Sequence, residues 1–173
     1  MSQFRNPDRL TELLDREAIR DAIYTYCRGV DRADEAALRA AYWPDATDCH
    51  GAMANGPVEI FISKCLEIFK IGPRNIHQVS NVLIEFQSAT RAKVESYFSA
   101  LQRAGDQQAH LAGRYCDIFE KRGEEWRVLK RVVVYDWVAP QVAPTQDEAT
   151  RFGGRTPIGA AYPDDPIYQI DKS

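Results

Sequence analysis

The chain has 173 residues, of which 45% are hydrophobic and 27% charged, and its formal net charge at pH 7 is −3. This composition is typical of one globular domain with a sizeable core. The small negative charge gives no electrostatic reason to expect nucleic acid or an anionic membrane surface as a partner. The sequence has no apolar run of membrane-spanning length and no apolar secretion signal near residue 1, so we expect a cytoplasmic protein.

Three helices are predicted in the first 72 residues. The first begins at Asn6-Pro7 and continues to about Gly29, because apolar residues recur at helical spacing along it. The second is capped by Asp34 and covers about 36–42, and Pro44 ends it. A short, turn-rich hairpin is expected over 46–55. The third helix follows Gly56-Pro57 and ends at Gly72.

From residue 74 the hydrophobic period changes to two, which predicts strands. The expected strands are 74–87, 91–103, 107–121 and 125–138, with turns at 88–90, Gly105-Asp106 and Gly123. Strands with such short connections are expected to form an antiparallel meander. Because the strands are unusually long, the sheet should twist and curl strongly.

The fourth strand is apolar on both faces, so both faces should be covered. The helices can cover one face, and a second copy of the chain is the expected cover for the other. We therefore expect self-association as a dimer or trimer. The last 35 residues contain five of the nine prolines and no regular period. We expect a domain over 1–138 and an extended arm over 139–173, packed on the domain or on a neighbouring subunit.

His77 lies near the start of the first long strand, on a largely apolar face. Histidine titrates near neutrality, so an enclosed histidine suits proton transfer. The alternative is a core histidine with a satisfied hydrogen bond. Strict alternation puts these residues on two faces: Ile76, Val82, Ile84 and Phe86 on one, and His77, Val79, Asn81 and Leu83 on the other.

Asp31 lies at the exit of the first helix. A carboxylate is electrostatically unfavourable near a helix C-terminus. Asp31 therefore either has a specific partner or is solvated.

Four sequence segments resemble the SnoaL-like branch of the nuclear-transport-factor-2-like superfamily, over roughly residues 10–138. They are IYTYCRGVDRAD, GPVEIFISKCLEIF, NIHQVSNVLIEF and EEWRVLKRVVVYDW. The resemblance implies an α+β fold, in which three N-terminal helices pack on a strongly curved antiparallel sheet and form a cone with an internal pocket.

The branch contains scytalone dehydratases, hexachlorocyclohexane dehydrochlorinases and bile-acid 7α-dehydratases. The residues that match their functional positions are Asp31 in GVD, His77 in NIH and Arg131 in LKR. Tyr26 stands where the dehydrochlorinases carry a lysine and is similar to the tyrosine of the dehydratases. This difference favours a hydroxyl or carbonyl substrate over a halide.

The resemblance implies acid–base catalysis by these four residues. Asp31 would accept the Nδ1 proton of His77, and Nε2 would remove a proton from carbon. Arg131 or the Tyr26 hydroxyl would stabilise a substrate oxygen as it gains charge. The expected substrate-binding residues are Tyr24, Trp43, Asn81, Tyr135 and Trp137.

Each expected catalytic residue also has a structural interpretation. Arg131 can be a member of a structural ion pair, and Tyr26 can be a core aromatic residue whose hydroxyl reaches a backbone group.

No metal or other cofactor is expected. His50 and His110 lack the close spacing of a metal motif, although His110 is a candidate for the pocket mouth. The cysteines are widely spaced, which predicts reduced thiols and neither a zinc site nor a disulfide framework. They are Cys27, Cys49, Cys65 and Cys116.

The functional hypothesis is a cofactor-independent lyase, such as a dehydratase, or an isomerase. It would bind a small hydrophobic ring compound and act through a His-Asp dyad. Two alternatives remain open: a non-catalytic subunit similar to the small subunit of aromatic-ring-hydroxylating dioxygenases, and a ligand-binding protein.

Overall fold

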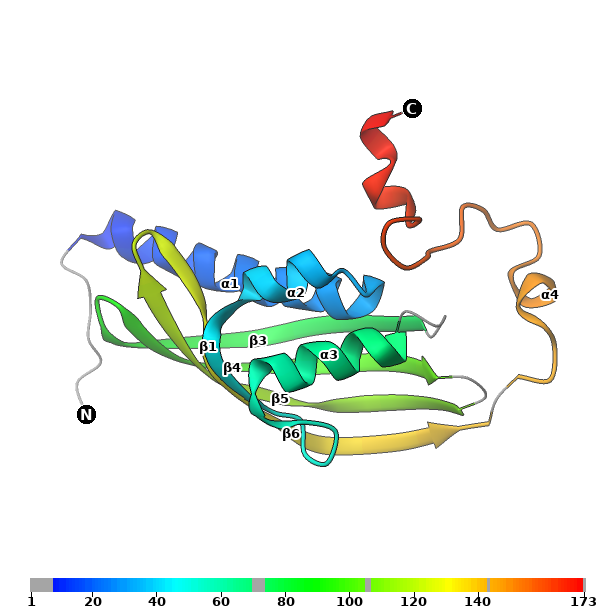
Figure 1. Ribbon diagram of the computed structural model, residues 1–173, viewed down its shortest axis with the longest axis horizontal. Coiled ribbons are helices and arrows are strands. Elements are labelled where there is room, and N and C mark those ends of the chain that lie inside the picture. Colours follow the sequence, from blue (N-terminus) through cyan, green and yellow to red (C-terminus); the bar gives the residue numbers. More distant parts are fainter. Residues whose placement is uncertain (1–7, 70–73, 105–106, 143, 173) are drawn as a thin grey trace.

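The computed structural model describes residues 8–69, 74–104, 107–142 and 144–172. In this part of the chain, three helices pack on one face of a curved six-stranded sheet, and an arm follows the last strand (Figure 1). The predicted α+β class is therefore confirmed. No helix in the described part combines the length and the apolar character needed to cross a membrane.

The first helix, α1 (Arg9–Arg32), begins and ends later than predicted. Asp8 caps it by accepting a hydrogen bond from the Leu10 N–H, while Asn6 lies outside the described residues. At the other end Ala33 takes the left-handed conformation, with φ 50°, and terminates the helix. The helix thus extends three residues beyond its predicted end at Gly29, and Asp31 lies in its last turn.

The other two helices follow the sequence pattern closely. Asp34 caps α2 (Glu35–Ala41) through the Ala37 N–H, as predicted. The third helix is α3 (Val58–Phe69), and its predicted stop at Gly72 lies outside the described residues.

The sheet has the strand order β2-β1-β6-β5-β4-β3. The predicted meander is confirmed, although its Gly105-Asp106 turn lies outside the described residues. The sheet as a whole is mixed, because β1 runs parallel to β6. The strands are β1 (Tyr42–Cys49), β2 (Asn55–Pro57), β3 (Arg74–Ser88), β4 (Arg91–Ala104), β5 (Gln107–Arg122) and β6 (Glu125–Gln141).

A bulge in β3 changes which side chains face the helices. Asn81 is left-handed, with φ 50°, and the pairing of β3 with β4 shifts between Ser80 and Leu83. The extra residue reverses the alternation. His77 therefore shares the covered face with the buried Ile84 and Phe86, which strict alternation had placed on the opposite face.

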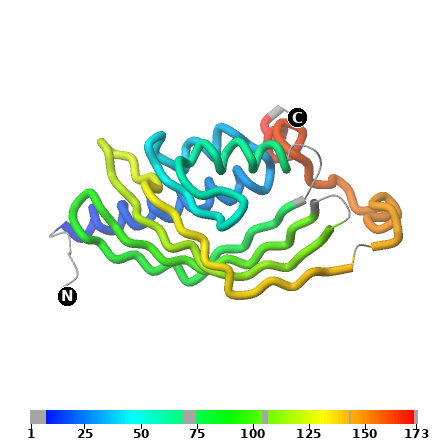
Figure 2. Tube along the Cα trace, turned by 60° about the horizontal axis from the view of Figure 1, so that its bottom comes forward, coloured from blue at the N-terminus to red at the C-terminus, as the bar shows by residue number. Residues whose placement is uncertain are grey.

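The sheet curves around the helices, which lie against its concave face (Figure 2). It remains open, because β2 and β3 are its two edges. Buried apolar residues from α1, α2, α3 and the concave face form one core. The opposite, convex face of the sheet carries no helix in the described part of the chain (Figures 1 and 2).

The arm is less extended than predicted. It contains α4 (Glu148–Phe152) and two short 3-10 turns, Pro166–Tyr168 and Ile170–Lys172. Its last part returns to the end of α1 (Figure 1). There Asp165 pairs with Arg32 at 3.0 Å, and the Tyr168 hydroxyl donates to Asp34 at 2.8 Å.

Candidate active site

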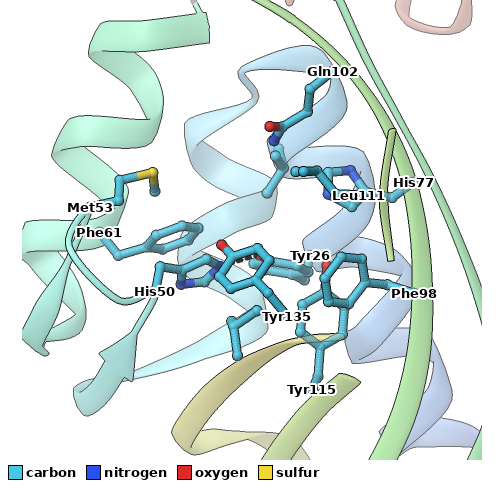
Figure 3. A pocket seen from close by; sticks show the side chains of 12 residues that line it. Tyr26, His50, Met53, Phe61, His77, Phe98, Gln102, Leu111, Tyr115 and Tyr135 are labelled. Carbon is cyan, nitrogen blue, oxygen red and sulfur yellow. Dashed lines mark hydrogen bonds between the residues drawn. The ribbon is translucent and has the colours of Figure 1, made fainter. Parts of the chain in front are cut away.

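A small cavity of about 80 Å³ lies between the helices and the concave face of the sheet (Figure 3). Its lining is mostly aromatic and aliphatic, with few polar side chains, as is usual for a ligand site. The lining residues are Tyr26, Val30, His50, Met53, Phe61, His77, Phe98, Gln102, Leu111, Tyr115, Val133 and Tyr135.

His77 reaches this cavity from β3 and is held by Asp31 from the last turn of α1. The His77 Nδ1 lies 2.6 Å from Asp31 Oδ1, and the His77 backbone N–H donates to Asp31 Oδ2 at 3.0 Å. The two side chains are only 6% and 13% exposed. Both carboxylate oxygens thus bind the same residue, which explains how an acid is accommodated at a helix C-terminus.

This contact has a direct consequence for the imidazole. An ionised carboxylate is only an acceptor, so Nδ1 carries the proton and Nε2 is left with a lone pair. No hydrogen bond from a described residue occupies Nε2. The ring is therefore oriented as a base, and Asp31 can stabilise its protonated form.

Tyr26 and His50 form a second polar group in the cavity. The Tyr26 hydroxyl lies 3.1 Å from His50 Nε2, and His50 Nδ1 is hydrogen-bonded to Asp48. The His50 ring is stacked on Phe61, with 4.2 Å between ring centroids. Burial and the neighbouring Tyr115 and Tyr42 raise the pKa of Tyr26 well above its ordinary value, against the opposing effect of Arg131.

Arg131 does not line the cavity, in contrast to the expectation that it contacts a substrate oxygen. Its side chain is completely buried, and its Nε and Nη2 donate to the two oxygens of Asp117 at 2.8 and 2.6 Å. The guanidinium lies over the rings of Tyr26 and Tyr115, at 4.1 and 4.2 Å from their centroids. This geometry fits the interpretation of Arg131 as a member of a structural ion pair, because the guanidinium N–H groups donate to partners inside the core.

Tyr135 and Trp137 lie on opposite faces of β6, although both were expected in the pocket. A register shift pairs Tyr135 with Gly113 but Trp137 with the adjacent Ala112. Tyr135 lines the cavity, whereas Trp137 is 64% exposed. Gly113 permits this arrangement, because a Cβ there would lie 2.0 Å from the Val134 carbonyl oxygen.

Three other expected substrate-binding residues lie away from the cavity. Tyr24 is two residues from the buried Tyr26, so it points to the opposite side of α1 and is exposed. Trp43 is buried, but its indole N–H donates to the Glu120 carbonyl oxygen, and Arg122 and Arg127 lie over its rings. Asn81 is exposed at the bulge of β3.

Several residues that line the cavity or hold its lining were not predicted from the sequence. Asp48 and His50 are two residues apart at the end of β1, so their side chains share one side, and this i, i+2 spacing was an available signal. Gln102 and Phe98 come from the even-numbered face of β4, as does the buried Ala100.

His110, a candidate for the pocket mouth, does not line the cavity. Its Nε2 is 2.8 Å from the Ser99 hydroxyl.

The described residues contain no group of three or more side chains that could hold a metal ion. The four cysteine thiols are unpaired, and Cys27 and Cys65 are buried in the core.

Residues 11–132 match the family described as the SnoaL-like domain. The chain belongs to this family. The match begins within the first turn of α1 and covers the rest of that helix, α2, α3 and the strands up to the first half of β6. It therefore includes both Asp31 and His77. Comparison with curated protein sequences gives no match.

Solved structures of the same fold include a hexachlorocyclohexane dehydrochlorinase of type 2. It is 25% identical, with a TM-score of 0.68, over 79% of this chain and 97% of that one. A protein from Novosphingobium aromaticivorans named as a candidate scytalone dehydratase is 21% identical, with a TM-score of 0.67, over 85% and 98%. A candidate aromatic ring hydroxylase from the same organism is 17% identical, with a TM-score of 0.62, over 75% and 94%. The last two show likeness of fold alone.

Proposed function

We propose that the protein is a cofactor-independent acid–base enzyme that removes a proton from carbon in a small, largely apolar ring compound. Elimination of water and double-bond isomerisation are the two reactions of this type that we favour. The observation that carries the proposal is the His77–Asp31 pair at the cavity, in which Nδ1 is bound to the carboxylate and Nε2 has no hydrogen-bond partner among the described residues.

The chemistry requires a base, a carbon acid and a donor for the oxygen that gains charge. His77 Nε2 is the base, and Asp31 stabilises the imidazolium that forms. The substrate is a ketone or a related carbonyl compound, because the carbonyl makes the adjacent C–H acidic. The hydroxyls of Tyr26 and Tyr135 and the amide of Gln102 line the cavity and are the available donors.

The size and lining of the cavity restrict the substrate. A volume of about 80 Å³ is well below the roughly 300–1,000 Å³ of pockets for drug-sized ligands. The compound should therefore be no larger than about one six-membered ring. The aromatic lining favours a ring without charge.

The comparisons support a reaction of this class. The family match spans the dyad, and the similar structures include a protein named as a hexachlorocyclohexane dehydrochlorinase. That name describes an elimination reaction, which includes loss of a proton from carbon.

Hydrogen–deuterium exchange tests the base without knowledge of the natural substrate. Cyclohexanone is incubated with the protein in D₂O, and loss of its α-proton signals is followed by NMR. We expect exchange faster than in buffer alone and a loss of about 100-fold or more in His77→Gln, because general bases contribute roughly 10²–10⁴. Asp31→Asn should also slow exchange, since it removes the acceptor that fixes the imidazole.

His110→Gln is the matched control, because this histidine lies outside the cavity lining. It should exchange cyclohexanone protons at the rate of the unsubstituted protein. Circular dichroism establishes that each variant is folded. Exchange at the buffer rate with the unsubstituted protein, or equal loss in the folded His77 and His110 variants, would contradict the proposal.

A further inference from the structure

We propose that Asp48, His50 and Tyr26 form a second proton relay, which protonates a leaving hydroxyl group opposite the His77 base. This inference rests on the proposed function, because it assigns the acid that acts together with that base. It also specifies the substrate class as a β-hydroxy ketone, which loses water to give a conjugated enone.

The relay is a continuous chain of hydrogen bonds that ends in the cavity. Asp48 binds His50 Nδ1, and His50 Nε2 lies 3.1 Å from the Tyr26 hydroxyl. His50 and Tyr26 both line the cavity, and Figure 3 shows His50 on the side of the drawn cluster opposite His77. One imidazole–carboxylate pair thus stands on each side of the space for substrate.

The surroundings keep the relay in place and shield it from water. Asp48 and Tyr26 are each 1% exposed. The Tyr42 hydroxyl donates to the second oxygen of Asp48 at 2.7 Å, so this carboxylate accepts hydrogen bonds on both oxygens. The stack of His50 on Phe61 fixes the plane of the imidazole. Such fixed donors are suited to catalysis because they need little reorganisation during the reaction.

Arg131 lies behind the relay, outside the cavity. Its guanidinium is 4.1 Å from the centroid of the Tyr26 ring and 3.4 Å from the Tyr42 hydroxyl. A positive charge at this place stabilises negative charge on Tyr26 when the phenol gives up its proton. Its effect on the reaction is therefore indirect, through the tyrosine.

The proposed step balances in protons and electrons. His77 Nε2 takes the proton from the carbon beside the carbonyl, and the C–H electron pair becomes the new C=C bond. The C–O bond at the β-carbon breaks, and the hydroxyl leaves as water with the Tyr26 proton. The step requires the protonated form of His50, which returns a proton from Nε2 to Tyr26 and becomes neutral. Proton exchange with solvent restores both histidines.

The relay distinguishes a hydroxyl from a halide as leaving group. Hydroxide is a poor leaving group and needs a proton, whereas chloride leaves without one. A cavity that contained only the His77 base would serve a halide substrate equally well. The relay therefore indicates loss of water.

Two ketones that give the same product test this inference. The probes are 3-hydroxycyclohexanone and 3-chlorocyclohexanone, which lose water and hydrogen chloride respectively and both yield cyclohex-2-enone, followed by its ultraviolet absorption. His50→Gln should lower kcat for the hydroxy ketone by about 100-fold or more, the usual contribution of a general acid. Its kcat for the chloro ketone should change by less than about threefold. A purely structural role would slow both reactions alike.

Companion variants separate the relay from the base. Asp48→Asn should repeat the selective loss if His50→Gln does not fold, His77→Gln should lose both reactions, and His110→Gln should lose neither. Equal loss of both reactions in His50→Gln, or no loss, would overturn the relay while leaving the cyclohexanone exchange test of the base unaffected. Failure of the unsubstituted protein to dehydrate the hydroxy ketone would overturn the assigned substrate class.

Discussion

At the scale of single residues, the buried Arg131 guanidinium affects the stability of the fold and also lies beside Tyr26 of the candidate site. It binds both oxygens of Asp117, and both side chains are fully buried. Burial raises the pKa of the Asp117 carboxyl, although Arg131 opposes this effect. A buried pair of this kind contributes little net stability over an apolar pair, but removal of one partner leaves an uncompensated charge.

Arg131→Met should therefore destabilise the protein by about 3–5 kcal/mol. The double substitution Arg131→Met with Asp117→Leu should recover most of this loss, since both charges are then absent. Urea unfolding monitored by circular dichroism measures both free energies of unfolding. A loss in Arg131→Met below about 1 kcal/mol would contradict the assignment of Arg131 to a structural ion pair.

At the scale of helices and strands, local signals predicted most boundaries. The meander strands differ from their predicted bounds by at most three residues at either end, because period-two alternation and the turn residues between strands are local. The bulges at Asn81 and in β6 were not predicted, because one extra residue leaves composition unchanged while it reverses the faces. Trp137 and Asn81 were misplaced for this reason.

The contacts within the site join residues that are far apart in the sequence, and local patterns could not predict such contacts. His77 and Asp31 were paired through resemblance to a family, although 46 residues separate them. Asp48 and His50 could be placed on one side of a strand from spacing alone. The contact of His50 with Tyr26 depends on how the end of β1 packs against α1, which no local pattern encodes.

The arm contacts α1 through Asp165 and Arg32, and this contact should depend on pH. Burial opposes ionisation of Asp165. The backbone N–H groups of Ala160 and Ile167 and the charge of Arg32 outweigh this effect and hold its pKa below the ordinary value. A carboxyl whose pKa is lower in the folded state contributes stability above its unfolded pKa, about 3.9, and loses it as pH falls through the folded value.

The attachment of the arm should therefore be complete at neutral pH and weaken below about pH 4. Asp165→Asn should release the arm even at pH 7, with a local loss of about 1–3 kcal/mol, because a charged hydrogen-bond acceptor is removed. Amide hydrogen exchange of residues 160–168 measures this loss. Asp164→Asn, at the exposed neighbouring acid, should leave the exchange unchanged. Equal protection in all three proteins would contradict the role of Asp165.

At the scale of the whole molecule, the convex face of the sheet carries several large, exposed apolar side chains. Strand register puts five large, exposed side chains on this face, away from the helices. They are Ile76, Leu83, Tyr97, Leu101 and Trp137, each at least 43% exposed. Apolar patches of this kind mark contact surfaces in soluble proteins. The described end of the arm packs on α1, while Glu148 of α4 pairs with Arg103 near the end of β4 at 3.5 Å.

We therefore expect self-association through the convex face. Trp137 should be one of the residues that contribute most to the binding energy of this contact. Sedimentation equilibrium at micromolar concentration should give the mass of at least two chains. Trp137→Glu should weaken association by about 2 kcal/mol or more, because aromatic hot-spot residues contribute this much and a carboxylate would have to be desolvated. Tyr24→Glu is the matched control, since Tyr24 is an exposed aromatic residue on α1. A monomeric mass for the unsubstituted protein, or equal weakening by both substitutions, would exclude the convex face as the contact surface.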